Sequence, residues 1–366
     1  MICEFNPFHN GHKFLLEKIK ADYADEIVCI MSGNFVQRGD IAITDKYTRT
    51  KAALQNGADA VVELPTPYAV SGANTFAKNG VRIAKSLNCD RLCFGAEDGL
   101  ELLTELVELL EDDRTNDKIQ TAMRNGQYYP KALSLAVGEE YANIIEQPTH
   151  RLALEYIRAC RMYDIEPVAI ERRGALHDDT ATHGDIASAS KIRSLIAHGE
   201  AYQAFTPMVI DKACDLRSLE TAILYRLKTI APEEMEKIAD VSEGLHNRII
   251  EAAKQNHSLE EILCTVKTKR YTMARLRRIL IAVLLNITAD IQKTPVSFLR
   301  VLGIRYGKES ILKDAKLPLI VKTKADYDKL DDSAKEIFRV DLNAAEAMNL
   351  ADRLIHNEFT QGITKV

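Results

Sequence analysis

A His-x-Gly-His pattern formed by His9, Gly11 and His12 is the arrangement in this sequence that points most directly to chemistry. It follows an apolar run, Met1–Phe5, and opens a segment with helical spacing, Lys13–Asp22. The first turn of a helix presents backbone N–H groups and the positive end of the helix dipole, so it suits an anion. Gly11 lets the backbone approach a phosphate closely, while both imidazoles can donate hydrogen bonds to phosphate oxygens. The pattern predicts a phosphate site that can stabilise charge developing at an α-phosphate. Taken alone, it is equally compatible with two helix-start histidines beside a structural glycine.

A second polar group lies at the start of another helical segment, Ser190–His198. Ser188 or Ser190 can cap this helix, and Lys191 and Arg193 fall where they could reach the leaving phosphates of a nucleotide. Alone, the group is typical of a capped helix with solvated basic side chains. Together, the two groups resemble the paired H-x-G-H and S-[ST]-x-[IL]-R motifs of the nucleotidyltransferase superfamily, with Ala189 in place of the first serine. Members of that superfamily attack the α-phosphate of ATP and expel pyrophosphate.

The elements that must position these groups alternate between short apolar runs and helical spacing, which is typical of βα units on a parallel sheet. The expected strands are Met1–Phe5, Glu26–Met31, Ala60–Leu64, Arg91–Phe94 and Pro167–Glu171. The expected helices are Lys13–Asp22, Asp45–Asn56, Ser71–Ser86, Leu100–Glu111, Arg151–Met162 and Ser190–His198. We therefore predict an α/β fold with a Rossmann-like parallel sheet whose ligand site lies at the carboxyl ends of the strands.

The strand signals stop at about Phe205, and helical patterns separated by turns, Gly303 among them, follow. This predicts a catalytic domain over residues 1–204 and a mostly α-helical domain over 205–366, each large enough to bury its own core. The helical part contains a basic stretch without acidic residues, Val266–Arg278, whose charge suits the phosphates of an RNA. A solvated basic helix is the simpler alternative. The candidate RNA-binding residues are Lys267, Lys269, Arg270, Arg275, Arg277 and Arg278.

The resemblance narrows to one family, the bacterial tRNA(Met) cytidine acetate ligases. Its motifs are matched, in order, by Glu4–His12, Met31–Gly39, Lys46 with Arg49–Lys51, Glu63–Pro65, Phe94–Glu97, Ile186–Arg193, Glu243–Leu245 and Lys267–Thr272. The resemblance implies ATP-dependent activation of acetate to acetyl-adenylate, followed by acetylation of N4 of the wobble cytidine in elongator tRNA(Met). Family members carry further strand residues before the position of Ile2, so we expect a short first strand here.

The resemblance also implies roles for individual residues. The nucleotide-binding stretch comprises Ile2, Cys3, Glu4, Phe5, Asn6, Pro7, Phe8, His9, Asn10, Gly11, His12, Lys13, Phe14 and Leu15. Further nucleotide contacts are implied at Gly95, Thr149, Arg172 and Arg173; the family's Pro-Asn-Asn segment reads Pro148-Thr149-His150 here, so a hydroxyl stands in place of an amide. The expected catalytic residues are His9, His12, Lys46, Lys191 and Arg193. Arg38, Lys46 and Arg49 could each meet ATP, acetate or tRNA, or form an exposed charged face, and the sequence does not distinguish these alternatives.

Composition sets limits on the other function classes. The 366 residues carry 48 basic and 53 acidic side chains, a formal net charge of −5, so any RNA surface must be local. The 7 cysteines form no C-x-x-C pair, which predicts reduced thiols and neither zinc nor another protein-bound metal. We expect ATP with Mg²⁺ as co-substrate and no tightly bound organic cofactor. Because no apolar run is long enough to span a membrane, we expect a cytoplasmic protein without a membrane partner.

Two other functions fit the same two motifs. The first is a small-molecule adenylyltransferase that makes a dinucleotide cofactor, although such an enzyme has no need of a basic helical domain. The second is a non-catalytic RNA-binding protein that retains an ATP-like pocket. N4-acetylcytidine in tRNA excludes the first alternative, and acetate-dependent pyrophosphate–ATP exchange excludes the second.

Overall fold

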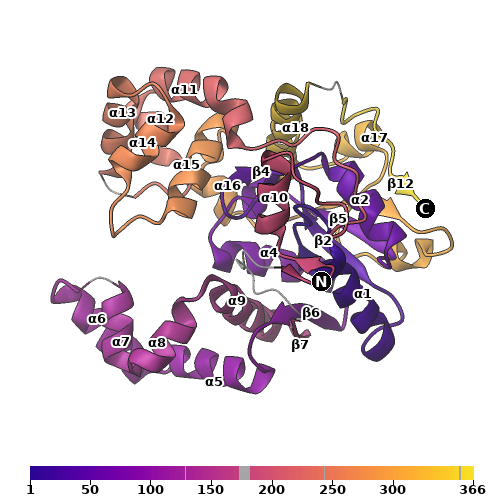
Figure 1. Cartoon of the computed structure of the whole chain (residues 1–366), viewed down its shortest axis with the longest axis horizontal. Coiled ribbons are helices and arrows are strands. Elements are labelled where there is room, and N and C mark those ends of the chain that lie inside the picture. Colours follow the sequence, from indigo (N-terminus) through magenta and orange to yellow (C-terminus); the bar gives the residue numbers. More distant parts are fainter. Residues whose placement is uncertain (128, 173–181, 243, 354–355) are drawn as a thin grey trace.

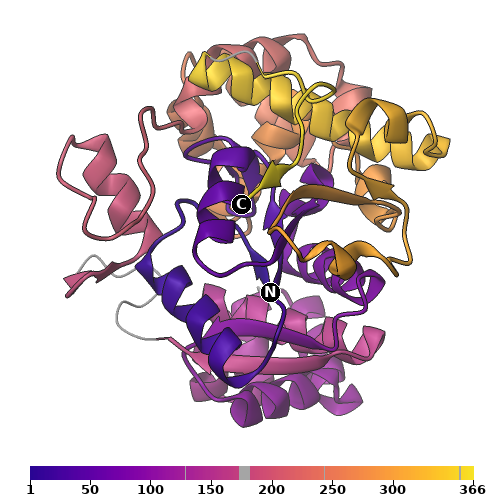
Figure 2. The ribbon, with the colours of Figure 1, turned by 90° about the vertical axis from the view of Figure 1, so that its right-hand side faces the viewer.

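The computed structural model describes residues 1–127, 129–172, 182–242, 244–353 and 356–366 (Figures 1 and 2). The predicted strands are present as β1 (Ile2–Cys3), β2 (Val28–Ser32), β5 (Ala60–Leu64), β6 (Arg91–Ala96) and β7 (Glu166–Glu171). β2 pairs in parallel with both β1 and β5, as expected for βα units. All five residues of both β2 and β5 are buried, which explains why these strands are apolar apart from Ser32 and Glu63.

The C-terminal part of the chain completes this sheet. β10 (Leu299–Ile304) pairs with β5 in the antiparallel sense, and β11 (Leu319–Ile320) and β12 (Thr364–Lys365) pair in parallel with β10. The prediction that strands end near Phe205 is therefore wrong. Gly303, expected to mark a turn, lies inside β10. Glycine fits this position because a Cβ atom would come within 2.6 Å of the Thr50 side chain on the helix that covers the strand.

β6 and β7 form a parallel pair of their own. Among the described residues no backbone pairing joins this pair to β1. The two sheets nevertheless share packing, because Cys3 of β1, Cys93 of β6 and Ile170 of β7 belong to one buried cluster. A break between parallel strands at this position leaves room for a ligand at their carboxyl ends.

The predicted helices of the first half are all present, with ends within a few residues of those expected. They are α1 (Asn10–Asp22), α2 (Lys46–Gln55), α4 (Ala73–Ser86), α5 (Leu100–Glu111), α9 (Pro148–Tyr163) and α10 (Ala189–Ala197). The sequence analysis missed α3 (Thr66–Ala69), α6 (Asp113–Arg124), α7 (Tyr129–Val137), α8 (Glu139–Glu146) and the hairpins β3 (Phe35–Val36) with β4 (Asp40–Ile41) and β8 (Thr182–His183) with β9 (Ile186–Ala187).

The second half is mostly helical up to β10, as predicted. Its helices are α11 (Glu220–Thr229), α12 (Pro232–Lys237), α13 (Leu245–Gln255), α14 (Leu259–Val266), α15 (Met273–Leu285), α16 (Ala289–Lys293), α17 (Thr323–Tyr327) and α18 (Asp332–Asp352), with 3₁₀ turns at Leu216–Leu219 and Glu309–Leu312. Among the described residues, no helix combines the length and apolar character needed to cross a bilayer.

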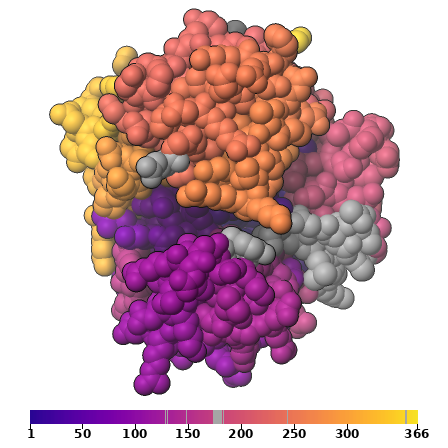
Figure 3. All heavy atoms as spheres, turned by 90° about the vertical axis from the view of Figure 1, so that its left-hand side faces the viewer, coloured from indigo at the N-terminus to yellow at the C-terminus, as the bar shows by residue number. Residues whose placement is uncertain are grey.

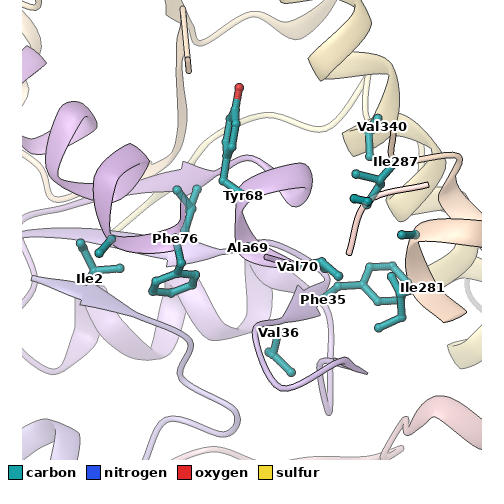
Figure 4. Packing of buried hydrophobic residues seen from close by; sticks show 14 of the residues in the cluster. Ile2, Phe35, Val36, Tyr68, Ala69, Val70, Phe76, Ile281, Ile287 and Val340 are labelled. Carbon is teal, nitrogen blue, oxygen red and sulfur yellow. The ribbon is translucent and has the colours of Figure 1, made fainter. Parts of the chain in front are cut away.

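One hydrophobic core joins the two halves. Phe35 and Val36 of β3 belong to the same buried cluster as Ile281 of α15, Ile287 and Val340 of α18, and Figure 4 shows the Phe35 ring close to Ile281. The expectation of two separate cores is therefore not met. The boundary between residues 204 and 205 divides the sequence but not the core, because β10 and α18 return to the first sheet.

A buried ionic cluster fastens the returning segment to that sheet. The Lys46 ammonium lies 2.8 Å from Glu63 Oε1 and 3.3 Å from Glu358 Oε1, and these side chains are at most 5% exposed. Arg300 of β10 pairs with both carboxylates, and the Tyr47 hydroxyl donates to Glu358. The cluster thus connects α2, β5 and β10 with the chain that follows α18.

Asp341 of α18 lies beside this cluster and accepts a hydrogen bond of 2.7 Å from the Thr66 backbone N–H. Burial, followed by the nearby Glu63 charge, raises the pKa of Asp341 to about 7. The folded protein therefore holds this proton more firmly than the unfolded chain does. This contribution to stability is complete at acidic pH and is lost as pH rises from about 4 to about 7.

We expect Asp341→Asn to raise the free energy of unfolding at pH 8 and to change it little at pH 4, because asparagine keeps the acceptor for Thr66 and has no charge to bury. Urea unfolding of parent and variant at both pH values measures the difference. An equal difference at both pH values would contradict the assigned pKa.

Candidate active site

A cavity of about 490 Å³ lies at the carboxyl ends of β1, β6 and β7. Its walls come from segments far apart in the sequence, including the start of α1, the β3–β4 hairpin and the starts of α9 and α10. On the face seen in Figure 3, the surface is hollowed between the orange helices of the second half and the magenta helices of the first half. The cavity takes residues from both sides, since Arg277 of α15 and Thr149 of α9 line it.

Two stacked imidazoles form the wall at the start of α1. The ring centroids of His9 and His12 are 3.7 Å apart. His9 Nδ1 accepts the Gly11 backbone N–H at 3.1 Å, and His12 Nδ1 accepts the His9 backbone N–H at 3.3 Å, which completes a capping box. Because Nδ1 is the acceptor in each neutral ring, the proton lies on Nε2, so each ring is a hydrogen-bond donor through Nε2. A Cβ atom at Gly11 would come within 3.0 Å of the His9 ring, which explains the glycine.

The serine-containing motif packs against the end of β1. Ser188 caps α10, its Oγ accepting the Lys191 backbone N–H at 3.0 Å. The Arg193 guanidinium donates to the Asn6 carbonyl at 2.6 Å and to Ser190 Oγ at 3.1 Å. Ser188, Ser190 and Arg193 all line the cavity. The structure therefore brings the two predicted motifs together.

Arg49 holds the floor of the site in place without lining it. Its guanidinium donates to the carbonyls of Glu4 at 2.6 Å, Ser32 at 3.1 Å and Thr44 at 3.2 Å, and also to that of Gly33. Desolvation by burial lowers the pKa of Arg49 to about 10. Arg49 is thus a positioning residue that joins the carboxyl ends of β1 and β2.

Glu4 connects this floor to the β3–β4 hairpin. Its Oε1 accepts the Gln37 backbone N–H at 2.7 Å, and Glu4, Gln37 and Arg38 all line the cavity. Burial raises the pKa of Glu4, opposed by its bond to Gln37 and by the charges of Arg193, Arg38 and Arg49.

Part of the cavity wall is apolar. Phe76 of α4, Phe94 of β6, and Leu152 and Tyr156 of α9 line it. The ring centroids of Phe94 and Tyr156 are 5.5 Å apart. A cavity whose wall combines clustered hydrogen-bond donors with aromatic rings can hold a phosphate group joined to a flat aromatic base.

Most of the expected nucleotide contacts line this cavity: Ile2, Cys3, Glu4, Phe5, Asn6, His9, Gly11, His12, Phe14, Leu15, Gly95, Thr149 and Arg172. A Cβ atom at Gly95 would come within 3.3 Å of Arg172 Nε, so a larger residue there would displace the Arg172 side chain slightly. Arg173 lies outside the described residues. Whether the lining residues touch a nucleotide stays a prediction.

Several expected residues do not line the cavity. Phe8 is fully buried, and its ring packs against that of His12. Asn10 Nδ2 donates to the carbonyls of Asp185 and Ala204, and Lys13 is exposed. Pro7 and Lys191 are also absent from the cavity wall. Lys46 belongs to the buried ionic cluster and does not line the cavity, which indicates a structural role; its expected catalytic role stays a prediction.

The basic stretch is divided in the structure. Arg277 lines the cavity, whereas Lys267, Lys269 and Arg270 are exposed around the turn before α15. Arg275 donates to the Asp240 carbonyl at 2.7 Å, and Arg278 pairs with the Asp240 carboxylate at 2.7 Å. Arg275 and Arg278 therefore hold the loop before α13. The basic stretch contains no acidic residue, but in the folded protein Asp240 is an acidic partner for it.

The sequence analysis missed Asp40 and the aromatic wall. Asp40 lines the cavity on β4, directly after the quoted motif ending at Gly39. Positive φ at Gly39 (80°) marks a tight hairpin turn, for which Gln37-Arg38-Gly39 was a usable signal. Phe94 was quoted only as part of the Phe94–Glu97 motif, and Tyr156 gave no signal, because an apolar residue facing a ligand looks the same in sequence as one facing the core.

Comparison with known proteins gives concordant results. The family model described as HIGH Nucleotidyl Transferase matches residues 1–361. The tRNA(Met) cytidine acetate ligase of Caldanaerobacter subterraneus is 35% identical over 96% of this chain and 94% of its own length. That of Lysinibacillus sphaericus is 32% identical over 100% of this chain and 95% of its own.

Solved structures are similar over the same extent. Thermotoga maritima TmcAL without ligand matches with a TM-score of 0.90 at 25% identity, covering 100% of this chain and 99% of that one. The same protein bound with alpha-thio ATP matches with a TM-score of 0.89, covering 100% of this chain and 98% of that one.

Proposed function

The chain belongs to the HIGH nucleotidyl transferases and, within them, to the tRNA(Met) cytidine acetate ligase family, and from this we propose that it is an ATP-dependent ligase. It activates acetate as acetyl-adenylate and acetylates N4 of the wobble cytidine of elongator tRNA(Met). The observation that carries the proposal is the cavity in which the two motifs meet, in a fold shared along its whole length with a relative bound to an ATP analogue.

The cavity supports a definite orientation for ATP. The Nε2–H groups of His9 and His12 and the start of α1 suit the phosphates, and the wall of Phe94 and Tyr156 suits the adenine. Attack of an acetate oxygen on the α-phosphorus forms acetyl-adenylate and releases pyrophosphate. Charge that builds up on the phosphate oxygens is then stabilised by donors that the capping box already holds in place.

This reaction needs no enzyme nucleophile. The acyl phosphate has AMP as a good leaving group, so the remaining task is to hold the reactants together, which can lower a barrier by about 7–11 kcal/mol. Cys3 lines the cavity, but burial raises its pKa, which disfavours the thiolate. Among the described residues no group of three or more His, Cys, Asp or Glu side chains could hold a metal ion. Mg²⁺ that accompanies ATP is held mainly by phosphate oxygens and water.

The tRNA side of the proposal rests on the exposed basic residues before α15. Because ATP, acetate and tRNA meet in the cytoplasm, we propose that the protein acts there. Reversing the charges in a Lys269→Glu/Arg270→Glu variant should weaken tRNA binding and reduce the log–log salt slope by up to about two, since each lost phosphate contact contributes close to one. Arg275 is left intact because it holds the Asp240 carbonyl.

Filter binding at several salt concentrations measures the slope, and Lys254→Glu, which changes an exposed lysine at the end of α13, is the control. An unchanged slope in the double variant would place the tRNA surface elsewhere.

Two assays test the whole proposal. Acetate-dependent pyrophosphate–ATP exchange reports the first half-reaction, and mass spectrometry of tRNA nucleosides reports N4-acetylcytidine. Exchange without N4-acetylcytidine would favour a small-molecule adenylyltransferase. Absence of both would favour a non-catalytic nucleotide-binding protein.

A further inference from the structure

The second half-reaction requires a place where the tRNA side of the molecule meets the nucleotide cavity. Of the six candidate RNA-binding residues, Arg277 is the one that lines the cavity. A Cβ atom added at Gly39 would lie 2.6 Å from both Arg277 Cβ and the Arg278 backbone nitrogen, so α15 packs directly on the hairpin turn. A cytidine approaching along the basic stretch therefore reaches the cavity next to Gly39.

Three carboxylates line the cavity in the part of the chain that the structure describes: Glu4, Asp40 and Glu171. Glu4 follows β1 and accepts the Gln37 backbone N–H through Oε1, and Glu171 is an exposed residue at the end of β7, so the position beside α15 and not hydrogen bonding distinguishes Asp40 from them. Asp40 follows Gly39 and so lies where the hairpin meets α15. Its Oδ1 accepts only its neighbour's backbone N–H, that of Ile41 at 2.9 Å, among the hydrogen bonds described for it.

The chemistry of the acceptor calls for a carboxylate at this place. The exocyclic N4 amine of cytidine carries two N–H donors, and Asp or Glu is the usual side chain that accepts from it. Uridine has an acceptor oxygen at the same position, which a carboxylate repels. The N4 amine is also a weak nucleophile, and it must lose a proton because the product is a neutral amide.

We propose that Asp40 is a catalytic residue of acetyl transfer, an inference that rests on the proposed function. Asp40 binds the N4 amino group of the wobble cytidine and takes its proton. The N4 lone pair forms a bond to the acetyl carbonyl carbon, and the bond between that carbon and the phosphate oxygen breaks. AMP leaves with the electron pair, and the N4 proton passes to the Asp40 carboxylate and from there to water. Burial raises the pKa of Asp40, opposed by its bond to Ile41 and by the charges of Arg277 and Arg193, and this makes it a better base than an exposed aspartate.

The test compares the two half-reactions in the full-length protein. Asp40→Asn keeps the size and polarity of the side chain but removes the base. We expect the ratio of single-turnover acetyl transfer, measured with tRNA(Met), to acetate-dependent exchange to fall by about 100-fold or more. Asp40→Glu should recover at least tenfold of that loss, whereas Asp211→Asn, which changes an exposed carboxylate outside the cavity wall, should leave the ratio at its parent value.

Two outcomes would overturn the inference: a ratio in Asp40→Asn equal to that of the parent, or an equal loss in both half-reactions, which would assign Asp40 to adenylate formation or to folding. Failure of the proposed function gives a different result, because the parent protein itself would then lack exchange or form no N4-acetylcytidine.

Discussion

His12→Ala should slow acetate-dependent pyrophosphate–ATP exchange by between about 10-fold and 1,000-fold, the loss that follows removal of one preorganised donor. His12 Nδ1 accepts the His9 backbone N–H, so Nε2–H is the donor side of the ring. Because this donor stabilises charge that develops during attack on the α-phosphorus, the loss should fall mainly on kcat rather than on KM for ATP.

A capping role for His12 must be separated from a catalytic one. Loss of a helix cap costs about 1 kcal/mol of stability but not the chemistry of the folded protein. Exchange is therefore measured well below the melting temperature of the variant, with His257→Ala, an exposed histidine before α14, as the control. Parent-like exchange in both His9→Ala and His12→Ala would mean that the phosphates bind elsewhere.

Lys46→Met should lower the free energy of unfolding by about 3–5 kcal/mol, the usual cost of removing one partner from a buried ion pair. The Lys46 and Glu63 side chains are each 1% exposed, and without the ammonium the described cation that still pairs with Glu63 and Glu358 is Arg300. A double variant, Lys46→Met/Glu63→Gln, should recover part of the loss, because it also removes one of the unpaired charges.

The effect should depend on pH in a definite direction. The charges of Lys46 and Arg300 hold the pKa of Glu358 down at about 2, against the cost of burial. The stability that this pairing provides is present above the ordinary carboxyl pKa and is lost as pH falls towards 2. The difference between parent and Lys46→Met should therefore shrink below about pH 4.

Urea unfolding from pH 3 to pH 8 measures this difference, with Lys329→Met as the control for an exposed pair; that lysine is 74% exposed, so its loss should cost under about 1 kcal/mol. If Lys46→Met is as stable as this control, the Lys46 ammonium does not stabilise the buried cluster. A folded Lys46→Met variant without exchange activity would instead restore the catalytic role that the sequence suggested.

The sequence by itself determined the features that depend on neighbouring residues. Strands such as Ala60–Leu64 and helices such as Leu100–Glu111 were predicted with correct bounds, because apolar spacing and flanking turns are local signals. The meeting of the two motifs in the cavity, where we propose that the phosphates of ATP bind, was predictable for the same reason. The donors of the first motif come from one strand end and one helix start, and a second motif of equally local character caps α10.

Tertiary structure decided which distant residues meet. Lys46 and Arg49 were compatible in sequence with an exposed charged face and with contacts to ATP, acetate or tRNA, yet both are buried. Lys46 is covered because β10 and the chain after α18 return to α2 and β5, whereas Arg49 is enclosed by the carbonyls of Glu4, Ser32 and Gly33. Arg277 and Asp40 are distant in sequence and share one cavity, because α15 packs on the turn at Gly39. Periodicity fixes which face of an element is apolar, but not which other element buries that face. The partners of a charged residue are therefore settled only when the sheet and the helices pack together.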